Sequence, residues 1–193
     1  MSDLSKLEKV KEILESEGEN PEVIVDSDYN IPELKLEFSK RICSFDITIE
    51  GKNIAWCESI NGDAYLLRVI QNGNDFRWKP KSRNGDDMCV PLLLEWYENH
   101  LLFIYLDEHG IFVTSVKDGI VNDVFIHGCD LARNGNMLAY DTYTNRLRDH
   151  VKILELPSLK SLRPISIYKA KRDGLVPKEV MQPGAADLAF KKE

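Results

Sequence analysis

The stretch that decides the fold runs Leu101-Leu102-Phe103-Ile104-Tyr105, turns at His109-Gly110, and continues Ile111-Phe112-Val113-Thr114-Ser115-Val116. Two such runs, rich in aromatic and β-branched residues and separated by a glycine-bearing turn, are typical of two paired strands. The same strand–turn–strand pattern occurs earlier at 53–69 and later at 135–156. These units recur at roughly 35–50 residues, the range in which repeated β units are found. The sequence therefore predicts an array of similar hairpins.

From residue 43 onward, nearly the whole sequence reads as strand and turn. Asn-Gly dipeptides begin at positions 61, 72, 84 and 134, and Glu50-Gly51 and Asp118-Gly119 add two further turn signals. Asn-Gly favours the type I′ hairpin turn, because both central residues need positive φ. No helical pattern separates the strands, so antiparallel pairing should dominate. The predicted strands are 43–49, 53–58, 63–70, 75–79, 88–96, 101–106, 111–116, 121–127, 136–141, 151–156 and 163–168.

The two ends of the chain differ from this middle part. Residues 3–17 place Leu4, Leu7, Val10, Ile13 and Leu14 on one helical stripe, and Gly18 ends the predicted helix. The stripe is expected to dock on the sheet and to cover one face or one open edge, although a partner-binding helix is the alternative. A short strand at 23–25 and a half-buried strand at 34–38 follow. We therefore predict a helix and linker over 1–33, an antiparallel β-repeat domain over 34–168 and a polar tail over 169–193.

The repeated unit resembles a blade of a β-propeller over about residues 43–168. The phrase Asn136-Met137-Leu138-Ala139-Tyr140 resembles the second strand of such a blade, and Trp56, Tyr105 and Tyr140 occupy matching places. The resemblance implies blade-like sheets, but three units fall short of the usual four to eight blades of a ring. The fold class is therefore expected to be mainly β, as an antiparallel meander or a partial propeller-like array with one N-terminal α-helix. The meander is slightly favoured.

Composition excludes some partners. The 193 residues carry a net charge of −7, which disfavours nucleic acid and anionic membranes because phosphate binding needs surplus Lys and Arg. The polar start and the absence of an apolar run of membrane-spanning length lead to an expected cytoplasmic location. Cys43, Cys57, Cys89 and Cys129 include no Cys-x-x-Cys pair, so we expect reduced, mostly buried thiols and no zinc.

Catalytic patterns are also missing from the sequence. It contains no Gly-x-Ser-x-Gly elbow and no Gly-rich phosphate loop, and its four histidines, His100, His109, His127 and His150, are scattered. We therefore predict no catalytic residue, no metal and no cofactor, and we expect the protein not to be an enzyme. A pocket built by long-range contacts would be the exception.

The favoured function is non-catalytic binding of another protein. One version is an immunity or antitoxin-like protein whose acidic surface neutralises a basic partner. The carboxylates singled out for it are Asp86, Asp87, Asp107 and Glu108, for which the alternative is a role as solvated turn residues. The rival function is a fragment or accessory β-propeller domain of a hydrolase. Exposed sheet edges would also allow a homo-oligomer.

Overall fold

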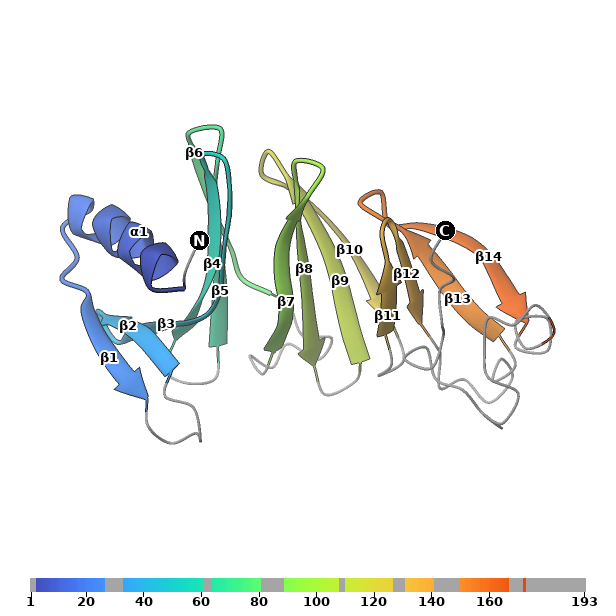
Figure 1. The fold of residues 1–193 in the computed structure, drawn as a ribbon, viewed down its shortest axis with the longest axis horizontal. Coiled ribbons are helices and arrows are strands. Elements are labelled where there is room, and N and C mark those ends of the chain that lie inside the picture. The colour runs from blue at the N-terminus through green and yellow to red at the C-terminus, as the bar shows by residue number, and fades with distance from the viewer. Residues whose placement is uncertain are drawn as a thin grey trace. The chain divides into compact units, whose positions relative to one another are not determined.

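The computed structural model describes residues 3–26, 33–60, 64–80, 89–107, 110–126, 131–140, 150–166 and 172. The described chain is mainly β, with a single helix at its N-terminal end and antiparallel strand pairs (Figure 1). The predicted fold class is confirmed. The chain divides into two compact units, one of residues 1–108 with 116–120 and one of residues 109–115 with 121–193.

Helix α1 (Asp3–Ser16) forms where the apolar stripe predicts it. It ends in a Schellman motif, in which Glu19 N–H donates to Leu14 C=O at 3.0 Å and Gly18 N–H donates to Glu15 C=O at 3.0 Å. Gly18 has a φ of 86°, a left-handed conformation that glycine adopts without steric cost. The cap therefore fixes the direction in which the chain leaves α1 toward the first strand.

Strands follow one another in sheet order as they do in sequence, so each sheet is a meander. The first sheet has the order β1-β2-β3-β4-β5-β6, with β1 (Glu22–Asp26), β2 (Glu33–Phe38), β3 (Arg41–Glu50), β4 (Asn53–Ile60), β5 (Ala64–Gln71) and β6 (Asn74–Trp78). The second has the order β10-β9-β8-β7, with β7 (Val90–Tyr97), β8 (His100–Asp107), β9 (Gly110–Lys117) and β10 (Ile120–Ile126). The third has the order β11-β12-β13-β14, with β11 (Leu131–Asn134), β12 (Met137–Tyr140), β13 (His150–Glu155) and β14 (Lys160–Ser166).

Several of the hairpin turns contain two residues in the left-handed region. Asn72-Gly73 has φ values of 52° and 81°, and Asp118-Gly119 has 49° and 78°, as type I′ turns require. Ser39-Lys40 and Glu98-Asn99 adopt the same conformation without glycine, so no glycine dipeptide marks these two turns in the sequence. The turn expected at Asn134-Gly135 lies one residue later in the structure. Asn134 pairs with Met137, so Gly135 and Asn136 form the turn.

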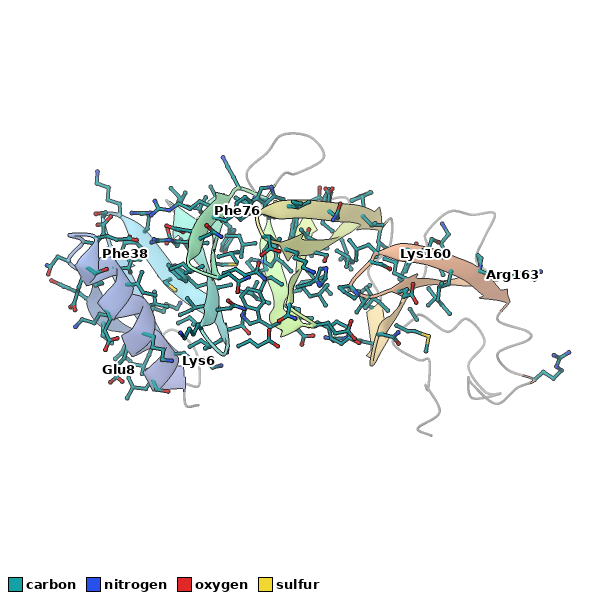
Figure 2. The ribbon with its side chains drawn as sticks, turned by 90° about the horizontal axis from the view of Figure 1, so that it is seen from above. Lys6, Glu8, Phe38, Phe76, Lys160 and Arg163 are labelled. Atoms are coloured by element: carbon teal, nitrogen blue, oxygen red, sulfur yellow. The ribbon has the colours of Figure 1, made fainter. Side chains whose placement is uncertain are left out.

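In the first unit, the first sheet packs against both α1 and strand β7. Strands β2, β3 and β4 supply the residues that pack with α1 (Figure 2); the shared core comprises Leu7, Val10, Leu14, Leu36, Phe38, Cys43, Ile54 and Trp56. On β7, Trp96 donates its Nε1–H to the carbonyl of Thr48 on β3 at 3.3 Å. The Trp78 ring lies edge-on to Phe103, with 6.3 Å between the ring centroids. Coverage on both sides explains why Ile54–Glu58 of β4 are buried at successive positions.

The second unit contains most of β9 and β10 together with the third sheet. Phe112 and Phe125 pack with ring centroids 4.8 Å apart. Gly110 lies so close to Ile126 that a Cβ atom built on it would stand 2.3 Å from the Ile126 carbonyl oxygen. The apolar residues of the third sheet that are buried include Leu138, Ala139, Tyr140, Ile153 and Leu154.

Candidate protein-binding surface

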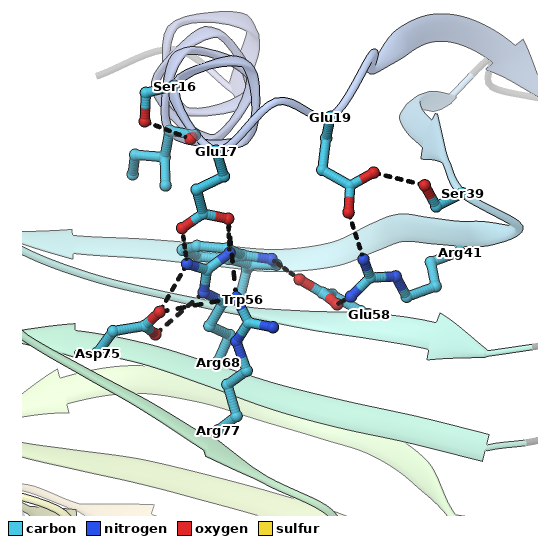
Figure 3. A network of polar contacts seen from close by, with 11 residues as sticks. Ser16, Glu17, Glu19, Ser39, Arg41, Trp56, Glu58, Arg68, Asp75 and Arg77 are labelled. Atoms are coloured by element: carbon cyan, nitrogen blue, oxygen red, sulfur yellow. Dashed lines mark hydrogen bonds and ion pairs between the residues drawn. The ribbon is translucent and has the colours of Figure 1, made fainter.

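The C-terminal end of α1 is anchored to the first sheet through Arg68 on β5. This side chain is only 1% exposed. Its guanidinium forms a two-pronged hydrogen-bonded ion pair with Glu17, and it donates to both carboxylate oxygens of Asp75 at 3.0 and 2.7 Å. It also lies over the Trp56 ring, 5.0 Å from the ring centroid. Arg68 thereby satisfies its buried donors with two carboxylates and an aromatic face (Figure 3).

A second anchor joins the residue after the helix cap to β3 and β4. Arg41 donates to Glu19 at 2.8 Å and to Glu58 at 2.9 Å, and its guanidinium lies 4.8 Å from the centroid of the Phe38 ring. Glu58 is fully buried and also accepts a hydrogen bond from Trp56 Nε1 at 2.9 Å. Trp56 and Glu58 are two residues apart on one strand, so they share a face of the sheet. Both anchors hold α1 on the sheet, which is a structural role.

The pKa values follow from these contacts. The hydrogen bond from Arg68 lowers the pKa of Glu17 below its ordinary value of 4.5. Burial would lower the pKa of Arg68, but its hydrogen bonds to Glu17 and Asp75 outweigh burial and raise that pKa. Burial raises the pKa of the Cys43 thiol well above its ordinary value, and the nearby Glu58 adds to the effect. The Cys43 thiol is therefore protonated and unreactive at neutral pH.

The Glu17 shift predicts how acid affects stability. A carboxyl whose pKa is lower in the folded protein stabilises the fold above its ordinary pKa, and that contribution is lost as the pH falls through the folded value. We expect Glu17→Gln to lower the urea midpoint at about pH 7, and we expect the difference from the parent protein to shrink as the pH falls below 4.5. Glu15→Gln is the control, because Glu15 is 52% exposed and pairs only at 3.7 Å with Lys11. A pH-independent difference for Glu17→Gln would contradict the assignment.

Negative charge is concentrated at the N-terminal end of the chain. Residues 1–40 hold eleven Asp and Glu and five Lys, so this acidic N-terminal region carries a net charge of −6 out of −7 for the whole chain. The two arginine anchors engage Glu17 and Glu19 of this region. The exposed carboxylates on α1 and on the β1–β2 hairpin include Glu8, Glu12, Glu15, Glu22 and Glu37. Figure 2 shows Glu8 on the side of α1 that faces away from the sheet.

Apolar side chains are exposed beside these carboxylates. Val23 and Val25 on β1 are 47% and 61% exposed, and Leu34 on β2 is 38% exposed. The strand register pairs Val23 with Leu36 and Val25 with Leu34, so all four residues lie on one face of the hairpin. Leu36 is part of the core under α1. The exposed valines therefore extend that core toward the free edge of the sheet.

Of the four carboxylates singled out from the sequence, Asp107 is the one whose position the structure describes. Asp107 lies at the end of β8 and is only 4% exposed, while Asp86, Asp87 and Glu108 lie outside the described residues. The predicted role of these four residues stays a prediction. Sequence reasoning missed the acidic N-terminal region because it treated the net charge as a property of the whole chain. Counting charges by segment would have located it.

Other predicted residues have defined places in the structure. Cys43, Cys57 and Cys89 are buried and form no disulfide, as expected, and Cys129 lies outside the described residues. His100 donates its Nδ1–H to the carbonyl oxygen of Glu98 at 2.9 Å. Among the residues with a described position, no three His, Cys, Asp or Glu side chains gather as a metal-binding group. No helix in the described ranges has the length and apolar composition to cross a membrane.

Comparison with known proteins adds no relative from which a function could be transferred. No protein-family model matches the chain, and neither a curated protein nor a solved structure matches it.

Proposed function

We propose that the chain is a non-catalytic protein-binding domain whose acidic N-terminal region receives a basic protein partner. The observation that carries this proposal is the concentration of the net charge in residues 1–40, beside exposed apolar residues of the β1–β2 hairpin. Exposed charge steers a partner of opposite sign, and apolar area that loses water on contact supplies affinity. Both kinds of group are present on the same hairpin.

An immunity or antitoxin-like role is the concrete form of this proposal. Such a protein would neutralise a basic partner by covering its positively charged surface, and the encounter would weaken as salt rises. A cytoplasmic location belongs to the same proposal. It is supported by the three buried cysteines that form no disulfide, since reduced cysteines are typical of reducing compartments.

The test is affinity capture from an extract of the source organism, with two charge-reversed proteins as baits beside the parent. The first bait carries Glu22→Lys and Glu37→Lys, and the matched control carries Glu50→Lys and Asp123→Lys, which are also exposed but lie outside residues 1–40. We expect the parent and control baits to capture the same basic protein and to release it at high salt. The first bait should fail to capture it. Equal capture by all three baits would refute the proposal.

A hydrolase-associated propeller domain is the second candidate, and the regular strand runs favour it. Beyond the β1–β2 hairpin, the strands form three runs of four: β3–β6, β7–β10 and β11–β14. Trp56, Tyr105 and Tyr140 are buried on the second strand of each run, as equivalent blade positions would be. This candidate predicts stable co-purification with a catalytic subunit. Capture of a basic protein without hydrolase activity would favour the first proposal over it.

A further inference from the structure

Among the residues with a described position, the outer edge of β1 is an end of the six-stranded sheet. In the described part of the chain, β1 pairs on one side with β2 and ends the strand order on the other side (Figure 1). Alternate residues of an edge strand direct their N–H and C=O groups away from the sheet. These groups form a row of donors and acceptors that an extended peptide satisfies by adding as a further strand.

The side chains along β1 indicate what such a peptide must contain. Val23 and Val25, on the face shared with α1, are 47% and 61% exposed. An added strand with apolar β-branched residues on that face would lie beside them and remove apolar area from water. Glu22 and Asp26 stand at the two ends of β1, and the exposed Glu22 already faces the exposed Glu37 across the strand pair. Like charges opposite each other are unfavourable, so Lys or Arg near Glu22 would relieve this repulsion.

The same charges oppose a second copy of this chain as the occupant. A symmetric antiparallel pair of β1 strands centred on Ile24 would place Glu22 of each copy opposite Asp26 of the other. Two further like-charge pairs would then form at the edge. A heterologous segment with basic ends has no such penalty.

We propose that the open edge of β1 binds an extended segment of a basic protein partner, which joins the sheet as an added strand. This inference rests on the proposed protein-binding function and specifies its mode. The recognised segment alternates apolar β-branched residues with polar ones and carries Lys or Arg at both ends. Backbone hydrogen bonds provide the pairing, while Val23, Val25 and Glu22 select the sequence.

The test measures binding of an array of synthetic peptides in which valine or isoleucine alternates with threonine between terminal lysines or arginines. The full chain is used, and hydrogen exchange reports which backbone amides become protected. We expect these peptides to bind and to slow exchange at residues 22–26. Matched peptides with N-methyl groups on alternate backbone nitrogens should not bind, because methylation removes the donors needed for strand pairing.

Protein variants separate the edge from general charge attraction. Glu22→Lys should weaken binding of the basic peptides by about tenfold, whereas Glu12→Lys, an equal charge change on the exposed side of α1, should have a much smaller effect. Equal binding of methylated and unmethylated peptides would overturn strand addition while leaving the proposed function standing. Failure of every basic peptide, with no basic protein captured, would overturn both. Dimerisation of the free chain that protects residues 22–26 would assign the edge to a second copy and overturn the inference.

Discussion

Replacing Arg41 with methionine is expected to lower the free energy of unfolding by about 3 kcal/mol, because it leaves a buried carboxylate without its cation. Glu58 is fully buried, and its described partners are Arg41 at 2.9 Å and the Trp56 indole N–H at 2.9 Å. Methionine keeps most of the side-chain volume over the Phe38 ring, so the loss measures charge and hydrogen bonding. Urea unfolding followed by tryptophan fluorescence would give the value.

Combining Arg41→Met with Glu58→Gln should recover about 1–2 kcal/mol of that loss, since a neutral amide still accepts the bond from Trp56 and carries no buried charge. Arg77→Met is the matched control. Arg77 is 46% exposed and meets Glu17 and Asp75 only at 3.7 Å, so its loss should cost less than about 1 kcal/mol. Equal destabilisation by the two arginine replacements would mean that Glu58 does not depend on Arg41.

Gly110→Ala is expected to destabilise the second unit by about 3 kcal/mol or more, because the added methyl group has no room. A Cβ atom on Gly110 would stand 2.3 Å from the backbone carbonyl oxygen of Ile126 and 3.0 Å from the Phe125 ring. A backbone oxygen inside a strand pair does not move aside as a flexible side chain would. Thermal unfolding monitored by circular dichroism would register the change.

Gly51→Ala provides the comparison for Gly110→Ala. Gly51 has a φ of 59°, and an added Cβ would meet nothing within 4 Å. Its replacement should therefore cost only the left-handed backbone penalty of about 1 kcal/mol. If the two alanine variants unfold at the same temperature, the result would contradict the close contact between Gly110 of β9 and the Ile126 carbonyl oxygen.

Much of the fold was predictable because period-two patterns and two-residue turns act locally. Each predicted strand overlaps an observed strand, including the short 23–25 segment, which becomes β1. Strand β11 was missed, since Leu131-Ala132-Arg133-Asn134 has little apolar alternation and is defined by its pairing with β12. The left-handed conformation of Ser39-Lys40 and Glu98-Asn99 was not expected, because neither pair contains glycine. In both cases the neighbouring strands impose a conformation that the residues alone do not favour.

The candidate site was less accessible to sequence reasoning. The Glu17–Arg68 contact joins residues 51 positions apart, and no periodicity signals such a pair. Asp107 follows a strand and precedes a turn signal, which favoured an exposed place, yet it is only 4% exposed. The sequence did indicate that the alternating valines of β1 form a strand. Their position at an open edge depends on the order of all six strands.

The sequential order of the strands also bears on how fast the protein folds. Because each strand pairs with its neighbour along the chain, hairpins such as β5–β6 and β7–β8 form by closing loops of only two residues. The entropy lost on closing such short loops is small, and low contact order accompanies rapid folding among small domains. The packing of helix α1 does not depend on neighbouring residues alone, because β4 must be in place before the sheet can bury the helix. Helix α1 precedes these strands in the sequence, yet it would be among the last of these elements to reach its native packing.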